Sequence, residues 1–330
     1  MKKIILLLAI ILIYSANAYS QEGKPFAKIF SNFNYNMSAE ELEDGFKEFE
    51  IKRSYLGYSY KFNDEFSAKI TFDVGSNSAG SAYTAYLKIA SLSWNINDKM
   101  TLNFGQIGTR NFKFMEKGWG KRYIYKSLQD EQKWASSADA GMTIDYSLTN
   151  NLSLDMQILN GEGYEKVQGS DALMRGGAGI TYTAGSISIR VSRDMMPRTS
   201  YGDNDAMQSI NTIAGIYKNG GITIGGEYNM QENSSYVLDD TKTGISAYGD
   251  YKLNDDYSIF ARYDQISSEN SDGCCITNDD GTLTIFGIQR KMTKGVTVAI
   301  NMQTWQDATL DGAKEAEAEN KLYINLEYKF

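Results

Sequence analysis

Several segments of the chain alternate between apolar and polar residues, which is the side-chain pattern of β-strands. In one of them the two sets separate completely, with Phe66, Ala68, Ile70, Phe72 and Val74 opposing Ser67, Lys69, Thr71 and Asp73. The same alternation recurs over 141–148, 152–158 and 296–303. Within 83–96 the phase breaks near Ala90, which indicates a β-bulge. The pattern predicts a chain built from antiparallel strands.

Short polar turns separate the strand segments at seven places. They are Asn63-Asp64, Asn97-Asp98, 149–151, Ala184-Gly185, Asn219-Gly220, Asn254-Asp255 and 293–295. Asn, Asp and Gly favour such turns because they tolerate positive φ or hydrogen-bond to their own backbone. Seven turns join fourteen strands, and one further strand lies at each end, at about 26–37 and about 320–330. We therefore expect about sixteen strands.

The first residues have the pattern of a secretory signal peptide. Met1-Lys2-Lys3 precedes an apolar run over 4–14, and Ser15-Ala16-Asn17-Ala18 supplies a small-residue cleavage site. The run is shorter than the roughly 20 residues that cross a bilayer, which disfavours the alternative of a membrane anchor. We expect cleavage after Ala18 and a single domain over 19–330.

The last strand segment is amphipathic and ends on an aromatic residue. Its apolar positions are Leu322, Ile324, Leu326, Tyr328 and Phe330. A terminal Phe in such a strand resembles the C-terminal signal of bacterial outer-membrane barrels, with Tyr328 and Phe330 recognised by the barrel-assembly machinery. The alternative is an edge strand of a soluble β-protein, but the signal peptide favours an all-β transmembrane antiparallel barrel.

Composition narrows the class further. After Ala18 no apolar run approaches the length of a transmembrane helix, and the mean hydropathy of the chain is −0.41. The 23 Tyr and only 2 Pro suit many strands whose aromatic rings lie at the membrane interfaces. The chain has no His, so it lacks the usual general base and the commonest metal ligand. An enzyme is the last-ranked hypothesis, and we expect no cofactor, no metal and no nucleic-acid partner.

Two features of the loops are given their simplest interpretation. The adjacent Cys274 and Cys275 can form a strained vicinal disulfide in an oxidising compartment, but two loop residues without function are preferred. Most outer loops are acidic, and a solvated surface is preferred over divalent cations that bridge the seventh loop to lipopolysaccharide.

A barrel of this size leaves an aqueous lumen. An even strand number places both ends and the tight turns on the periplasmic side, and the longer loops outside. The polar positions that alternate with the lipid-facing ones are predicted to face the lumen. The cations among them are Arg53, Lys61, Lys69, Arg190 and Arg262, and the carboxylates are Asp73, Asp145, Asp155, Glu227, Asp264 and Glu327.

The third loop, about Thr109–Ala135, is the longest connection and the most basic one. Its cations are Arg110, Lys113, Lys117, Lys121, Arg122, Lys126 and Lys133, against Glu116, Asp130 and Glu131 in a chain of net charge −8. Its six aromatic residues indicate that it is folded. If it folds into the lumen, its cations attract anions and repel cations at a constriction. The alternative is a basic outer loop that contacts lipopolysaccharide phosphates.

Short motifs resemble the phosphate-selective porin O and P family. They lie at 49–62 with 66–75, at Ala82–Leu87, at Leu102–Gln106 and at Asp139–Thr143, so the resemblance covers about 26–160 and the final strand. It implies a sixteen-stranded trimeric porin with a basic constriction. Where the family often has Lys after the 102–106 motif, this chain has Ile107-Gly108, and Arg110 or Lys113 is the candidate replacement.

Two functions follow as hypotheses. The first is a channel for passive diffusion of small hydrophilic solutes, with a preference for phosphate-like anions. The second is a non-conducting surface protein such as an adhesin, a receptor or a structural barrel. The expected partners are outer-membrane lipid, lipopolysaccharide, two further copies of the chain and small anionic solutes.

Overall fold

The computed structural model describes residues 22–38, 46–75, 83–169, 173–197, 206–269, 280–308 and 318–330. The predicted signal peptide, its cleavage after Ala18 and Cys274-Cys275 lie outside these ranges. So do most acidic residues of the first, seventh and eighth loops.

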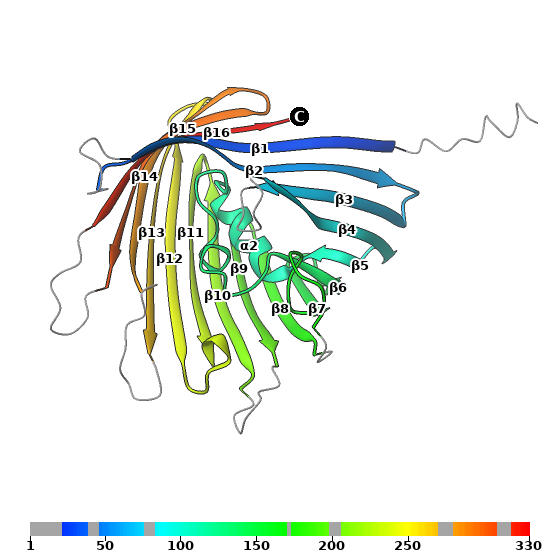
Figure 1. The fold of residues 1–330 in the computed structure, drawn as a ribbon. Helices are drawn as coiled ribbons and strands as arrows, with labels where there is room; N and C mark the ends of the chain where they lie inside the picture. Colours follow the sequence, from blue (N-terminus) through cyan, green and yellow to red (C-terminus); the bar gives the residue numbers. More distant parts are fainter. Residues whose placement is uncertain are drawn as a thin grey trace, which may run out of the picture.

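Sixteen antiparallel strands form one closed barrel in which each strand pairs with its sequence neighbours and β1 pairs with β16 (Figure 1). The strands are β1 (Glu22–Asn36), β2 (Phe46–Lys61), β3 (Phe66–Gly75), β4 (Thr84–Asn97), β5 (Met100–Gly108), β6 (Ala138–Ser147), β7 (Leu152–Leu159), β8 (Arg175–Ala184), β9 (Ile187–Met196), β10 (Gln208–Asn219), β11 (Ile222–Glu232), β12 (Thr241–Lys252), β13 (Tyr257–Glu269), β14 (Gly281–Thr293), β15 (Val296–Asp307) and β16 (Glu319–Lys329). The predicted fold class and strand number are confirmed.

All seven predicted turns join consecutive strands at one end of the barrel. Asn63 shows why, because its side-chain oxygen accepts hydrogen bonds from the backbone N–H groups of Glu65 and Phe66 and so closes the β2–β3 turn. Asn254 closes the β12–β13 turn in the same way. Both ends of the barrel wall lie at this turn end, since Glu22 pairs with Lys61 and Tyr328 pairs with Val296 beside the turns.

The two faces of the wall have the reverse of the polarity found in a soluble protein. On the outward face Phe104, Ile213 and Phe286 are 57% to 64% exposed. On the inward face Asp73 is 0% and Arg262 is 2% exposed. Large apolar side chains cover the outside because they meet lipid, and polar side chains occupy the inside.

A belt of outward aromatic side chains follows the turn end of the barrel. Its members include Tyr58, Trp94, Tyr146, Tyr182, Tyr217 and Tyr251. Rings of this kind lie at the boundary between hydrocarbon and headgroups, where one end of the side chain is apolar and the other meets water. No helix in the described ranges has the length and hydropathy to span a membrane.

Two β-bulges change which side chains point inward. The predicted phase break near Ala90 corresponds to a register shift opposite Thr71 and Phe72, where Lys88 is the extra residue between Leu87 and Ile89. A second shift between Phe30 and Ser31 leaves Lys52 as the extra residue of β2. A bulge inserts one residue into a strand, so the alternation of inward and outward side chains changes phase after each lysine.

Candidate functional site

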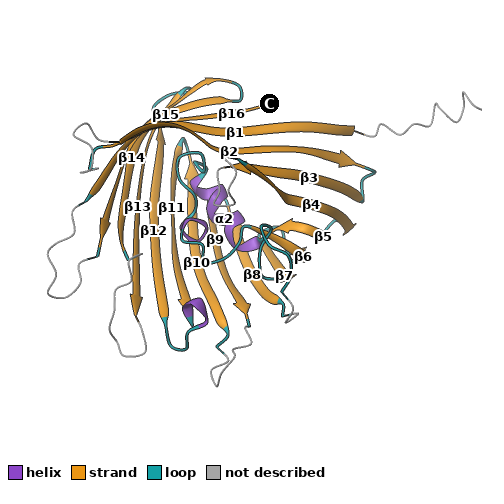
Figure 2. Cartoon of the chain, viewed as in Figure 1, coloured by secondary structure: helices purple, strands orange, loops and turns teal. Residues whose placement is uncertain are grey.

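The third loop is folded, as its aromatic content predicted, and links β5 to β6 through residues 109–137. It contains α2 (Arg110–Trp119) and the short α3 (Leu128–Glu131), drawn purple in Figure 2. Helix α2 ends at Gly120, whose φ of 66° is in the left-handed region that glycine adopts without strain. Its backbone N–H donates to the Glu116 carbonyl and closes the last turn.

One face of α2 packs against the inward face of the wall, and Figure 1 shows the helix over β9 and β11. Its buried residues are Asn111, Phe112, Met115, Gly118 and Trp119. The Trp119 ring meets Tyr248 of β12 edge-on at 5.5 Å and Phe260 of β13 at 6.1 Å. Gly118 permits this approach, because a Cβ there would lie 2.2 Å from the Tyr248 hydroxyl.

Hydrogen bonds from four strands hold the rest of the loop. Gln129 donates to Thr212 Oγ1 at 2.7 Å and to Asn229 Oδ1 at 2.6 Å. Arg262 Nη1 donates to the Lys126 carbonyl at 2.7 Å, and Asn325 Nδ2 donates to the Tyr123 carbonyl at 3.3 Å. These partners lie on β10, β11, β13 and β16, so the loop is fixed to a wide arc of the inward face.

Four of the seven predicted cations of the loop are paired with carboxylates. Arg110 pairs with Asp145, and Arg122 pairs with Glu116 and Asp130 of the loop itself. Lys121 Nζ lies 2.5 Å from Asp250 Oδ2, and Lys126 Nζ lies 3.4 Å from Glu131 Oε2. Burial lowers the pKa of Lys121, whereas the hydrogen bond and charge of Asp250 raise it. In these pairs the carboxylates offset much of the positive charge.

The other three cations, Lys113, Lys117 and Lys133, are exposed and form no ion pair with another described residue. Lys113 and Lys117 are four residues apart and so share the face of α2 that is not packed on the wall. Partial desolvation lowers the pKa of the Lys113 ammonium, and the charge of the neighbouring Arg110 lowers it further. This helix face carries the least compensated positive charge of the loop.

The five predicted lumen cations of the wall differ in their environment. Arg53 pairs with Asp73, Arg190 with Asp155, and Arg262 with Asp264. Lys61 pairs with Asp64 at the β2–β3 turn. Lys69 is exposed, and its Nζ lies 5.0 Å from the centre of the Phe26 ring. Among these five cations, Lys69 is therefore the one that forms no ion pair with a described carboxylate.

Strand periodicity missed one polar cluster. Asp73 on β3 accepts from Arg53 at 3.0 Å, from Lys88 at 3.2 Å and from the Tyr164 hydroxyl at 2.8 Å. Lys88 lies at the bulge of β4 and points inward, and Tyr164 comes from the β7–β8 connection, 91 residues after Asp73. The break near Ala90 was the available signal for Lys88, but no pattern in the sequence pointed to Tyr164.

Tyr328 and Phe330, the predicted assembly signal, lie at the seam of the barrel. Tyr328 pairs with Ile29 across the β1–β16 junction, and the Phe330 N–H donates to the Ala27 carbonyl at 3.1 Å. The Phe330 side chain is exposed. Their recognition by the assembly machinery stays a prediction.

Comparison with known proteins finds one matching family model and several solved structures that share the fold. The model of the family phosphate-selective porin O and P matches residues 28–185. No curated protein is a significant match. The outer-membrane channel DcaP of Acinetobacter baumannii shares the fold with a TM-score of 0.73 at 13% identity, over 94% of this chain and 97% of that one. An anion-selective porin from Comamonas acidovorans matches with a TM-score of 0.71 at 10% identity, over 94% of this chain and 100% of that one. The trimer form of OmpT from Vibrio cholerae gives 0.62 at 16% identity, over 94% and 100%.

Proposed function

We propose that the chain is an outer-membrane porin, which forms a water-filled channel for small hydrophilic solutes with a preference for anions. The family match over residues 28–185 and the sixteen-stranded barrel shared with outer-membrane channels support this proposal. The third loop, 109–137, forms the constriction of this channel.

The observation that carries the proposal is the asymmetry of α2. One face packs on the wall through Phe112, Met115 and Trp119, and the other presents the unpaired Lys113 and Lys117. Two ammonium groups without carboxylate partners lower the energy of a passing anion and raise that of a passing cation. Lys69 adds a third uncompensated charge on the wall.

The ion pairs refine which predicted cations act on solutes. Lys121, Arg122 and Lys126 hold the loop together and fix it to the wall, so their charges are largely offset by Asp250, Asp130 and Glu131. We therefore assign the anion preference to Lys113, Lys117, Lys133 and Lys69, and the shape of the constriction to the paired residues.

We extend the proposal to the surroundings of the barrel. The outward apolar face contacts outer-membrane lipid and lipopolysaccharide, and Tyr328 with Phe330 presents the strand that the barrel-assembly machinery recognises. A homotrimer is the proposed assembly, and its support is the trimer form of the similar OmpT barrel. We place the turn end in the periplasm, since barrels of even strand number have their short turns there.

Single-channel recording in planar bilayers tests the channel itself. Refolded protein is expected to give discrete current steps whose size rises with salt concentration, as in a water-filled pore. A folded, heat-modifiable barrel that inserts without giving current steps would support the non-conducting surface protein instead.

A further inference from the structure

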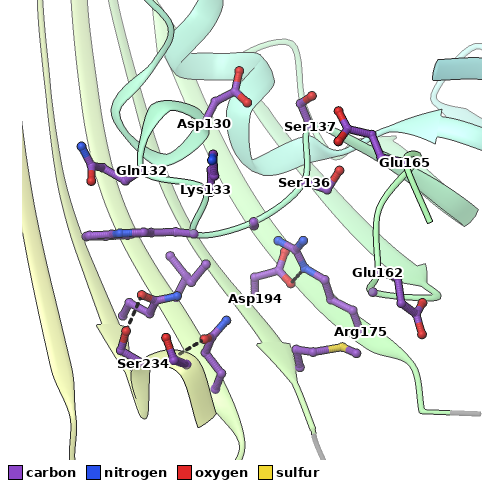
Figure 3. Close-up of a pocket in the computed structure, with 18 of the residues that line it drawn as sticks. Asp130, Gln132, Lys133, Ser136, Ser137, Glu162, Glu165, Arg175, Asp194 and Ser234 are labelled. Atoms are coloured by element: carbon purple, nitrogen blue, oxygen red, sulfur yellow. Dashed lines mark hydrogen bonds and ion pairs between the residues drawn. The ribbon is translucent and has the colours of Figure 1, made fainter. Parts of the chain in front are cut away.

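A cavity of about 600 Å³ lies between the third loop, the β7–β8 connection and strands β8–β12. Figure 3 shows Lys133 and Ser136 of the third loop on one side of this space and Arg175 with Asp194 of the wall across from them. This volume is in the range of sites that hold an organic molecule and far exceeds the space that an inorganic oxyanion fills. The cavity therefore accommodates a solute of several rings or chain atoms.

The charge of the lining is positive but mixed. Seven of the described lining residues are Lys or Arg and four are Asp or Glu. Asp130 and Asp194 pair with Arg122 and Arg175, whereas Lys133 and Lys166 are exposed and have no ion pair among the described residues. The free positive charge of the cavity thus lies at its exposed lysines.

Two buried atoms of the lining lack partners. Arg175 is 3% exposed and donates from Nε to Asp194 at 2.5 Å, but its Nη2 has no hydrogen-bond partner among the described residues. Glu162 accepts from the Gly169 N–H through Oε1, and its Oε2 is buried without a partner in the same set. An unpaired donor and an unpaired acceptor therefore belong to two residues that line one cavity, each at a cost of desolvation.

These two atoms discriminate between classes of ligand. A bare phosphate can accept from Arg175 but is repelled by the carboxylate of Glu162. A hydroxyl group can accept a hydrogen bond from Arg175 and donate one to Glu162. The serine and glutamine side chains of the lining, such as Ser136, Ser234 and Gln231, suit further hydroxyl groups.

The backbone around the cavity is also unusual. Five non-glycine residues of the described chain have positive φ, and three of them, Lys133, Ser235 and Tyr236, line this cavity. Such conformations cost free energy and concentrate at sites where side chains must be held in place for a ligand.

We propose that this cavity binds a hydroxylated anion, namely a sugar that carries a carboxylate or a phosphate, before the solute passes the constriction. The anionic group lies at Lys133 and Lys166, and the ring hydroxyls meet Glu162, Arg175 and the serines. The inference rests on the proposed channel, for which it names a class of solute.

Isothermal titration calorimetry on the refolded protein in detergent tests the site, since this readout needs no open channel. The probes are glucose 6-phosphate, glucuronate, glucose and inorganic phosphate. We expect the two sugar anions to bind about tenfold more tightly than either glucose or inorganic phosphate. Glucose lacks the charged contact, and inorganic phosphate lacks the hydrogen bonds of the ring hydroxyls. Comparison of the affinities for glucose 6-phosphate and glucuronate distinguishes a phosphate-specific site from a carboxylate-specific one.

Three variants locate the binding. The double variant Lys133→Gln/Lys166→Gln is expected to lower the affinity for glucose 6-phosphate about tenfold. Glu162→Gln is expected to weaken the binding of the sugar anions and to strengthen the binding of inorganic phosphate. A merely structural role of Glu162 does not produce this change in preference. Lys294→Gln, which removes the same charge at an exposed turn at the other end, serves as the matched control. Heat-modifiable migration verifies that each variant is folded.

Binding of inorganic phosphate as tight as that of glucose 6-phosphate would overturn the assignment of the ligand class. Equal affinities in the wild type and the Lys133/Lys166 variant would overturn the location. An anion-selective channel that binds none of the four probes would refute this site and leave the proposed function standing. Binding of the sugar anions by a protein that gives no conductance would refute the proposed function and would still support the binding site.

Discussion

Reversal of the charge of Lys113 and Lys117 tests the assignment of anion preference to α2. Both side chains are exposed on the helix face opposite the packed residues, and neither has an ion-pair partner among the described residues. The variant Lys113→Glu/Lys117→Glu therefore changes the charge of the constriction without removing a contact that holds the loop.

The size of the effect follows from Coulomb's law. At roughly 8 Å in a water-filled passage, each unit charge changes the energy of a monovalent ion by about 0.5 kcal/mol, and 0.1 M salt reduces this to about half. The double reversal changes the charge by four units, so chloride is destabilised and potassium stabilised by about 1 kcal/mol each. The ratio of chloride to potassium permeability is then expected to fall by about thirtyfold.

The assay is the zero-current potential of a planar bilayer in a gradient of KCl. Lys99→Glu and Lys294→Glu are the matched controls, because both lysines are exposed at tight turns and undergo the same charge change. We expect the controls to change the permeability ratio by less than about twofold, since both lysines lie at the turn end of the wall and outside the third loop. If the double variant keeps the wild-type potential, or if the controls shift it equally, α2 does not set the selectivity.

Three further predictions concern the constriction. Desolvation lowers the pKa of Lys113, so its charge is lost at lower pH than that of a free lysine. Anion preference should decline as the pH rises toward the ordinary pKa of lysine, and Lys113→Arg should reduce that decline in zero-current measurements. Asp250→Asn leaves Lys121 buried without its partner and should lower the free energy of unfolding by about 3 kcal/mol in urea titrations. Adding Lys121→Met to this variant should recover part of the lost stability. An Asp250→Asn variant as stable as the wild type would contradict the burial argument. Gly118→Ala places a Cβ against the Tyr248 hydroxyl and Ile216, so it should destabilise the packed loop by about 1–3 kcal/mol and increase open-channel current noise, whereas Gly215→Ala, which meets no atom within 4 Å, should do neither.

The architecture was predictable because each strand and each turn is specified by neighbouring residues. Alternation along 66–74 defines which face meets lipid, and residues such as Asn63 and Asn254 close their turns by hydrogen bonds within four positions. Consecutive strands joined by tight turns must pair, so the order of the barrel follows from the order of the chain.

The candidate site was predictable only in part. The length, charge and aromatic content of 109–135 indicated a folded basic loop, but its ion pairs depend on partners such as Asp145 and Asp250 that are distant in sequence. Which lysines remain uncompensated is therefore a property of the closed barrel. The contacts of Lys88 and Tyr164 with Asp73 likewise join residues that are far apart in sequence, at the β4 bulge and in the β7–β8 connection.

The most direct test of the central claim is the zero-current potential of the wild-type protein across a bilayer with a tenfold gradient of KCl. An anion-preferring porin gives a potential displaced toward the equilibrium potential of chloride, with a displacement that shrinks as salt screens the lysines. A potential displaced toward that of potassium at every salt concentration would contradict the account.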